Sequence, residues 1–248
     1  MTQNRSSAVM QQRSEAHDSL DDFPTPPWAT RALCEMLIKL GYPIRESVVW
    51  EPACNRGYMA EVLAEYFMAV HASDVHDYGY IQQDDVCDFL IDWATSRPKL
   101  DWIITNPPFR LGADFILRGL AVANHVAVLV RVAFDEGLAR YEALFRDQPE
   151  AFSMPFVERV VMWRGVLLDP DVPVWKPDKK QSDDPAAPPL GKMEKPSTAT
   201  AYQWLVFSND ADGPTQKHRI APCRKVLTRP GDYPDVPAHL RKPEGLLL

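Results

Sequence analysis

The feature that most constrains this chain is an apolar run that leads directly into an Asn-Pro-Pro-Phe turn. Trp102-Ile-Ile-Thr105 predicts a buried strand, and Asn106, Pro107, Pro108 and Phe109 follow it. The two prolines donate no backbone N–H and each holds φ near about −65°. The strand must therefore end at this point, with a stiff exit that fixes the direction of the next residues.

The chemistry offered by this turn is specific. The side-chain oxygen of Asn106 and the carbonyl of Pro107 are acceptors with no neighbouring amide N–H to compete for them, and the Phe109 ring is close by. Such a set fits a planar ring with an exocyclic NH₂ group, such as adenine. Because the lone pair of an aromatic amine is delocalised, accepting its two hydrogens makes the nitrogen a better nucleophile in the transition state. Asn-Pro-Pro also occurs as an ordinary loop breaker.

A second motif lies upstream. Ser47–Trp50 predicts a short buried strand, and apolar residues spaced along one face predict a helix after residue 57. Between them stands the turn Glu51-Pro52-Ala53-Cys54-Asn55-Arg56-Gly57. Strand, small-residue turn and helix form the front of a nucleotide-binding βαβ unit, in which free N–H groups face the ligand. Asn55 stands where a second glycine is expected, and asparagine tolerates the positive φ that such a turn requires.

Acidic residues follow in the order that such a fold uses. The run 69–74 predicts a second strand ending in Asp74, where a carboxylate commonly accepts two ribose hydroxyls. Asp88 and Phe89 then offer an acceptor and an apolar wall for a purine, although Asp84 and Asp85 compete for the same role. Each acid alone is more often a solvated turn residue, so the order of the motifs carries the prediction.

With these motifs the chain resembles the S-adenosylmethionine-dependent amino-methyltransferases, most closely the DNA adenine-N6 methyltransferases of phages and prophages. The resemblance rests on the turn 51–57, on residues 106–109 and on Phe23-Pro24-Thr25-Pro26-Pro27-Trp28, which matches the family's Thr-Pro element. It implies that S-adenosyl-L-methionine is the cofactor. It implies cofactor-binding roles for Thr25, Pro26, Glu51, Pro52, Ala53, Cys54, Asn55, Gly57, Asp74, Asp88, Phe89 and Asn106, with Asn106, Pro107, Pro108 and Phe109 catalytic.

The predicted fold is a Rossmann-like class I methyltransferase, a mostly parallel seven-stranded α/β sheet with helices on both faces. Residues 21–163 and 197–208 form this domain, and its last two strands are predicted at 160–163 and 201–207. Residues 1–20 are predicted to be a disordered tail. A proline-rich insert at 164–196, with seven prolines, is a candidate target-recognition loop or a solvent loop. Residues 209–248 form a basic extension.

Composition limits the class of protein. The first residues lack the apolar centre of a signal peptide, and no apolar run is long enough to span a membrane. The four cysteines fall in no disulfide or metal-ligand spacing, so we expect a cytoplasmic protein without a metal. Cys54 is interpreted as a packing residue and not a nucleophile.

Charge gives mixed evidence on a nucleic-acid substrate. The net charge of −7 argues against a nucleic-acid substrate, because phosphate binding depends on Lys and Arg. The segment from Thr215 to Lys242, however, contains seven Lys or Arg and only two Asp. It is therefore either a solvated tail or a phosphate-contacting arm. The free energy needed to flip a base out of a duplex exceeds the free energy recovered when that base stacks on one aromatic ring. A second group must hold the base, and Trp163, Phe134 and Trp175 are the candidates.

The sequence therefore predicts a DNA adenine-N6 methyltransferase with short or relaxed sequence specificity. Methylation of adenine or guanine in RNA uses the same motif and stays open. Methylation of a protein glutamine or of cytosine N4 is chemically close, although those families differ at the motif's last and first positions respectively. The non-enzymatic alternative is a cofactor-binding scaffold for a partner protein.

Overall fold

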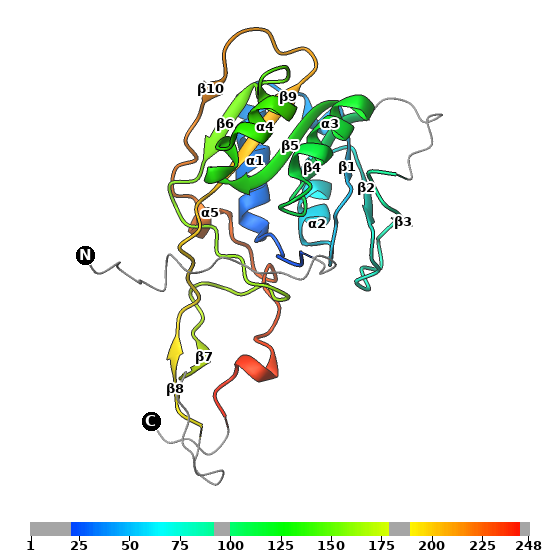
Figure 1. Cartoon of the computed structure of the whole chain (residues 1–248). Helices are drawn as coiled ribbons and strands as arrows, with labels where there is room; N and C mark the ends of the chain where they lie inside the picture. The colour runs from blue at the N-terminus through cyan, green and yellow to red at the C-terminus, as the bar shows by residue number, and fades with distance from the viewer. Residues whose placement is uncertain (1–20, 92–99, 179–188, 244–248) are drawn as a thin grey trace, which may run out of the picture.

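An eight-stranded sheet forms the centre of the protein (Figure 1). The structure is a computed structural model, and it describes residues 21–91, 100–178 and 189–243. The strand order is β10-β6-β9-β5-β4-β1-β2-β3. The strands are β1 (Val48–Glu51), β2 (Ala69–Asp74), β3 (Asp85–Val86), β4 (Leu100–Thr105), β5 (Ala123–Arg131), β6 (Phe152–Pro155), β9 (Tyr202–Ser208) and β10 (Gln216–Lys217).

The order of the strands reverses between β1 and β4. The chain runs outwards from β1 to β2 and β3, then returns to the other side of β1 and continues through β4 and β5, all in parallel. Val49 is paired with Trp102 and Trp50 with Ile103. This register places the turn after β1 next to the turn after β4. In open α/β sheets such a reversal point is where ligands bind.

Helices cover both faces of the sheet, because successive strand residues point to opposite faces. Trp102 and Ile104 pack with α1 (Pro27–Lys39) and α2 (Tyr58–Tyr66), whereas Ile103 packs with α3 (Gly112–Val122). The central parallel strands β1, β4 and β5 are buried over most of their length and read as near-continuous hydrophobic runs, as expected for a parallel sheet. The remaining short helical segments are Ile44–Glu46, Val132–Asp135, α4 (Leu138–Arg140), Tyr141–Phe145, α5 (Arg224–Leu227) and Ala238–Leu240.

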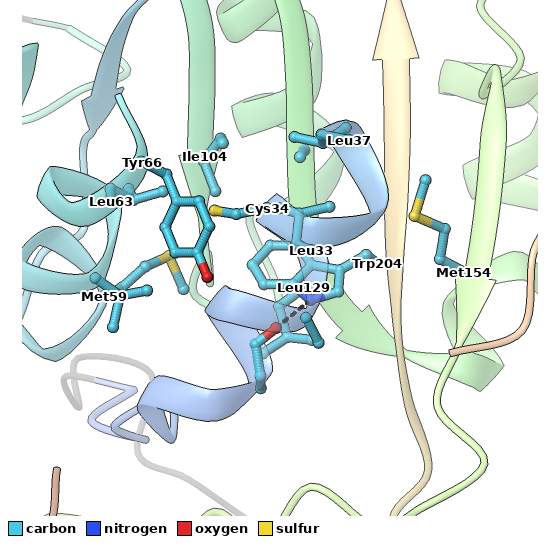
Figure 2. Close-up of a cluster of buried hydrophobic side chains, with 14 of the residues drawn as sticks. Leu33, Cys34, Leu37, Met59, Leu63, Tyr66, Ile104, Leu129, Met154 and Trp204 are labelled. Atoms are coloured by element: carbon cyan, nitrogen blue, oxygen red, sulfur yellow. Dashed lines mark hydrogen bonds between the residues drawn. The ribbon is translucent and has the colours of Figure 1, made fainter. Parts of the chain in front are cut away.

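The core under α1 is anchored by a buried tryptophan on β9. Trp204 has no exposed surface, and its indole Nε1 donates a 3.1 Å hydrogen bond to the Ala29 carbonyl in α1. Figure 2 shows this bond with Leu33, Leu37 and Cys34 around it. A buried indole N–H left without an acceptor is costly, so the bond fixes how α1 lies on the sheet.

The strand predicted at residues 160–163 is wrong. Val160, Val161 and Met162 are buried but form no strand, and Trp163 makes only an isolated bridge to Val166. The strand beside β9 is instead β6, which contains a serine and ends in a proline and so gave a weak signal. Burial of the apolar run 160–162 comes from packing over the α1 face rather than from sheet pairing. With β3 and β10, the sheet has eight strands instead of seven.

The predicted insert contains a β-hairpin. β7 (Val174–Pro177) pairs with β8 (Gly191–Glu194), and Figure 1 shows the hairpin projecting away from the sheet. Trp175 is buried against Gly191, where a Cβ would lie 2.6 Å from the Trp175 ring. The part of the insert at 179–188 and the predicted tail at 1–20 lie outside the described residues.

The C-terminal extension is tied to the sheet and to α1. β10 pairs with β6 as the edge strand, and α5 contacts α1. The guanidinium of Arg31 donates to Glu65 at 2.7 Å, to Asp232 at 2.6 Å and to the Leu227 carbonyl at 2.8 Å. Side chains of Arg31 and Asp232 are only 4% and 7% exposed. The described part of the extension is therefore packed structure rather than a free arm.

Candidate functional site

A cleft lies at the carboxyl ends of β1, β2 and β4, where the strand order reverses. It holds about 860 Å³ of space not filled by protein atoms, including its open mouth. Its lining consists of Asp21, Phe23, Pro24, Thr25, Glu51, Pro52, Ala53, Cys54, Asn55, Tyr58, Met59, Asp74, Val75, Tyr78, Asp88, Phe89, Asn106, Pro108, Leu111 and Phe115.

The turn after β1 has the backbone that a ligand-binding turn requires. Asn55 has φ of 51° and Gly57 has φ of 83°. Asn55 is the non-glycine residue with positive φ among the described residues, as its side chain allows. Its N–H donates to Asp74 Oδ2 at 2.9 Å, and the Cys54 N–H donates to the Ser73 carbonyl at 2.9 Å. The turn is thereby held against the end of β2.

Residues 21–25, which we call the N-terminal strap, join the two turns at the cleft. Asp22 Oδ1 accepts from Asn55 Nδ2 at 2.8 Å, and the Asp22 carboxylate pairs with Arg56 at 3.0 Å. Asp21 Oδ2 accepts from the Phe109 N–H at 2.8 Å. The strap therefore contacts the turn after β1 on one side and the turn after β4 on the other.

Two buried carboxylates face the cleft. Glu51 is 2% exposed, and its Oε2 is buried without a hydrogen-bond partner among the described residues. Burial, and then the nearby Asp74 carboxylate, hold the pKa of Glu51 well above its ordinary value. Burial also raises the pKa of Asp74, which accepts from the amides of Asn55 and His76. An uncompensated buried acceptor beside a second acid is a favourable site for a cationic group.

The structure separates Asp88 from its two competitors. Asp88 and Phe89 line the cleft, and Asp88 Oδ1 accepts from the Leu90 N–H at 2.9 Å. Asp84 is occupied elsewhere, because its Oδ2 accepts from the Ala72 N–H at 2.8 Å and lies 3.2 Å from His71. Asp85 lies 3.4 Å from the other nitrogen of that imidazole.

Asn106 lines the cleft, and its side-chain amide is held by the strap. The Nδ2 atom donates to the Phe23 carbonyl at 3.0 Å and lies 3.8 Å from the Met162 sulfur, so the strap fixes the orientation of the amide. The Oδ1 atom is buried and has no hydrogen-bond partner among the described residues. Of the two acceptors predicted from the sequence, the Asn106 side-chain oxygen is therefore unsatisfied within the described residues, and Pro107, which carries the other, is not among the residues that line the cleft.

Four predicted site residues do not line the cleft. Pro107 and Phe109 belong to the turn after β4, Pro26 is the residue that precedes α1, and Gly57 faces the Tyr80 ring. The ring of Phe109 is 4.2 Å from the guanidinium carbon of Arg131 and 5.7 Å from the ring centre of Phe23. The ring predicted to stack on a base is thus covered on one side by a cation.

The remaining aromatic candidates lie away from the cleft lining. Phe134 is buried under the guanidinium of Arg140, Trp175 is buried in the hairpin, and Trp163 is half-buried near the Ser197 carbonyl. Cys54 lines the cleft, but burial raises the pKa of its thiol above the ordinary value. A thiol that stays protonated is a poor nucleophile, in agreement with a packing role.

Sequence reasoning identified Thr25 but missed the two acids of the strap, Asp21 and Asp22, and two tyrosines. Asp21, Tyr58 and Tyr78 all line the cleft. The signal for the strap was present, because two acids directly precede the Thr-Pro element, but their partners are distant in sequence. Tyr78 belongs to the irregular loop after β2, where no periodicity points to a side-chain direction.

Within residues 21–91, 100–178 and 189–243, no group of three or more His, Cys, Asp or Glu side chains could hold a metal ion. The helices in these ranges are all too short or too polar to cross a membrane.

Comparison with known proteins supports the fold. No family model and no curated protein matches the sequence. The chain is similar to the structure of a proposed RNA methyltransferase from Pyrococcus horikoshii, with 14% identity and a TM-score of 0.50, over 81% of this chain and 96% of that one. A proposed class I S-adenosylmethionine-dependent methyltransferase from Listeria monocytogenes has 12% identity and a TM-score of 0.51, over 82% and 67%. The chain has the class I methyltransferase fold.

In this class I methyltransferase fold, the cleft lies where β1 and β4 separate the two halves of the sheet. Glu51 is the last residue of β1, and Asn106 directly follows the last residue of β4. The buried acceptors at the cleft therefore come from the two strands that the topology places side by side.

Proposed function

We propose that this protein transfers the methyl group of S-adenosyl-L-methionine to the N6 amine of adenine in DNA. The observation that carries the proposal is the Asn106 Oδ1 atom, which is buried and has no hydrogen-bond partner among the described residues, in a residue that lines the cleft. A buried amide oxygen is rarely left unsatisfied unless a ligand completes it. The adjacent Pro107 carbonyl supplies the second acceptor that an amino group requires.

The cleft residues fit the cofactor. The unpartnered Oε2 of Glu51 suits the ammonium of the methionine portion, and Asp74 suits the ribose hydroxyls. Asp88 and Phe89 offer an acceptor and an apolar wall to the adenine portion. Thr25 lines the cleft from the strap, next to Pro26. When bound, the cofactor supplies an electrophilic methyl group on a sulfonium.

The chain's own residues activate and orient the acceptor amine. Asn106 Oδ1 and the Pro107 carbonyl accept its two hydrogens, which draws the nitrogen towards a tetrahedral shape and localises its lone pair. Fixed acceptors of this kind stabilise the charge that develops on nitrogen in the transition state. No strong base is needed, because the amine proton becomes acidic once the nitrogen is alkylated. Holding the two reactants in line can supply roughly 7–11 kcal/mol of the barrier reduction.

A second candidate is amino-methylation of adenine or guanine in RNA. It is favoured by the similarity to the structure from Pyrococcus horikoshii, which is described as a proposed RNA methyltransferase. The acceptor geometry at Asn106 suits either nucleic acid, because the amine is the same. Protein glutamine and cytosine N4 stay as alternatives that the same experiment distinguishes.

The test is a panel of methyl acceptors. Purified protein is incubated with cofactor and, separately, with unmethylated duplex DNA, single-stranded DNA, ribosomal RNA and a protein extract. Products are digested and identified by mass, and the proposal predicts N6-methyladenine in DNA. Modification of only RNA or only protein overturns the DNA assignment. Tight cofactor binding with no transfer to any acceptor supports the scaffold alternative instead.

A further inference from the structure

Three arginines lie by the Asn-Pro-Pro-Phe turn or by the strap that contacts it, and the structure shows no ion pair between them and any described residue. We call Arg110, Arg131 and Arg164 the arginine rim. Arg110 directly follows Phe109 and is exposed, and Arg131 lies over the Phe109 ring. Arg164 is exposed beside Gly165, whose N–H donates to the strap carbonyl of Asp22 at 2.9 Å. All three therefore lie by the turn or by the strap that contacts it.

Arg131 differs from the other two because one of its nitrogens is buried without a hydrogen-bond partner among the described residues. It ends β5, the neighbour of β4, and so lies at the same edge of the sheet as Asn106. Its guanidinium carbon is 4.2 Å from the Phe109 ring centre, and its Nε is buried with no hydrogen-bond partner among the described residues. A guanidinium stays charged at all ordinary pH values and carries five N–H donors. An aromatic ring face interacts with the positive charge but does not provide hydrogen-bond acceptors for the five donors, so this guanidinium can still bind an anion.

Other arginines of this protein form ion pairs with carboxylates. Arg56 pairs with Asp22, Arg224 with Glu158 and Asp171, and Arg229 with Glu65. Two of these, Arg224 and Arg229, belong to the basic segment 215–242. In the segment predicted as a phosphate-contacting arm, part of the positive charge is therefore neutralised by ion pairs within the protein. The arginines of the rim form no such ion pairs with described residues.

We infer that the arginine rim binds backbone phosphates of the DNA strand that carries the target adenine, with Arg131 on a phosphate next to the flipped nucleotide. The inference rests on the proposed function. Guanidinium groups bind phosphate oxygens through two parallel N–H bonds. The rim places such donors beside the acceptors for the amine, which explains how a chain with net charge −7 can hold a polyanion.

The position of Arg131 also links strand binding to base binding. The guanidinium now covers a face of Phe109 that a flipped base would use for stacking. A phosphate that draws Arg131 off the ring leaves this face open to the base. Arg131 is thus a positioning residue, because it acts through the DNA backbone and through Phe109 rather than on the reacting amine.

The test measures DNA binding as a function of salt. Full-length wild type and Arg131→Met are titrated into a fluorescein-labelled duplex of mixed sequence, with S-adenosylhomocysteine present, at several salt concentrations. Each phosphate contact contributes about 0.9 to the slope of log K against log salt in duplex DNA. We expect Arg131→Met to lower this slope by about 1 and to raise the KM for DNA about tenfold, with cofactor Kd unchanged. Arg110→Gln and Arg164→Gln each lower the slope by a similar amount.

Two control variants separate charge from packing. Arg45→Met removes another guanidinium that lies over an aromatic ring, 5.8 Å from the centre of Tyr66, but at the amino end of β1. It should leave the slope unchanged. Arg131→Lys keeps the charge and should restore the slope, which a purely structural role on Phe109 does not predict.

The outcomes distinguish this inference from the proposed function. Wild type that binds and methylates DNA, with rim variants of unchanged slope and KM, overturns the inference and leaves the function standing. Wild type that neither binds nor methylates DNA overturns both.

Discussion

The side-chain nitrogen of Asn55 donates a 2.8 Å hydrogen bond to Oδ1 of Asp22. Asn55 has positive φ, a conformation that glycine adopts most easily, yet only a side chain can reach the strap. Asp22 also pairs with Arg56. The residue at position 55 therefore serves both the backbone of the turn and the closure of the cleft by the strap.

Asp22→Ala is expected to weaken cofactor binding more than it weakens folding. The variant removes the acceptor for Asn55 and Arg56, so the strap loses its bond to the turn after β1. A hydrogen bond of this kind contributes about 1 kcal/mol, and the partly exposed ion pair adds little. We expect the cofactor Kd to rise about fivefold by calorimetry, with a small change in Tm. Asp212→Ala, an exposed acid outside the cleft lining, is the control. An unchanged Kd for Asp22→Ala would show that the strap does not support the cofactor site.

Gly57→Ala is expected to damage the site through two effects. A Cβ at Gly57 would lie 2.2 Å from the Tyr80 ring, and φ of 83° is unfavourable for alanine. Gly41 has φ of 89°, and a Cβ added there would meet no atom within 4 Å, so Gly41→Ala reports the φ effect alone. We expect Gly41→Ala to cost about 1 kcal/mol of unfolding free energy and Gly57→Ala clearly more.

Thermal and urea unfolding measure both variants. The double variant Gly57→Ala/Tyr80→Ala should regain the unfolding free energy lost to the steric clash and keep the loss caused by the unfavourable φ. Equal losses for Gly41→Ala and Gly57→Ala would mean that the Tyr80 contact does not constrain the turn.

Glu51→Gln is expected to stabilise the empty protein and to weaken cofactor binding. The pKa of Glu51 is raised in the folded state, so the folded protein keeps this proton to higher pH than the unfolded chain. Ionisation therefore costs stability as pH rises above the unfolded value of about 4.3. Without cofactor, the variant should have a higher Tm than wild type at pH 8, and the difference should shrink at pH 5.

Cofactor binding should show the opposite preference. The ammonium of the cofactor favours the ionised carboxylate, so wild-type affinity should rise with pH through the pKa of Glu51. The variant should lose this pH dependence and bind about tenfold more weakly at pH 8. Glu46→Gln, at an exposed position, is the control. A wild-type affinity that falls as pH rises from 5 to 8 would contradict the assignment of Glu51 to a cationic group.

Arg31→Met is expected to be the most destabilising of the charge variants. Arg31 joins α1, α2 and the C-terminal extension through Glu65 and Asp232. Removing the cation leaves Asp232 buried without its partner, which costs about 3–5 kcal/mol. Asp232→Asn leaves Arg31 paired with Glu65 and should cost less, about 1–2 kcal/mol. Urea unfolding with equal, small losses for both variants would show that the extension is not part of the cooperative unit.

Much of the sheet could be predicted because its signals are local. The apolar run ending at Thr105 and the Asp-terminated run at 69–74 are strands in the structure, and positive φ at Asn55 follows from its residue type. The strand predicted at 160–163 was wrong because an apolar run that is buried against α1 has the same sequence pattern as one that is buried in a sheet. Sequence periodicity records burial and not the hydrogen-bond partner.

The parts of the site that escaped prediction depend on contacts between distant residues. The bond from Asn106 to the Phe23 carbonyl spans 83 positions, and the contact between Asp21 and Phe109 spans 88. The cation over Phe109 comes from the end of another strand. Only the register of β1, β4 and β5 brings these groups together, and residue patterns do not fix that register.

The most direct test of the central claim is the rate of methyl transfer to adenine by Asn106→Ala. Single-turnover reactions with isotopically labelled cofactor and unmethylated DNA measure labelled N6-methyladenine by mass, and calorimetry measures cofactor Kd for the same proteins. We predict transfer by wild type, a loss of about 10²–10³-fold in Asn106→Ala, and a cofactor Kd that stays within about threefold. Labelled N6-methyladenine formed by Asn106→Ala at the wild-type rate would contradict the account.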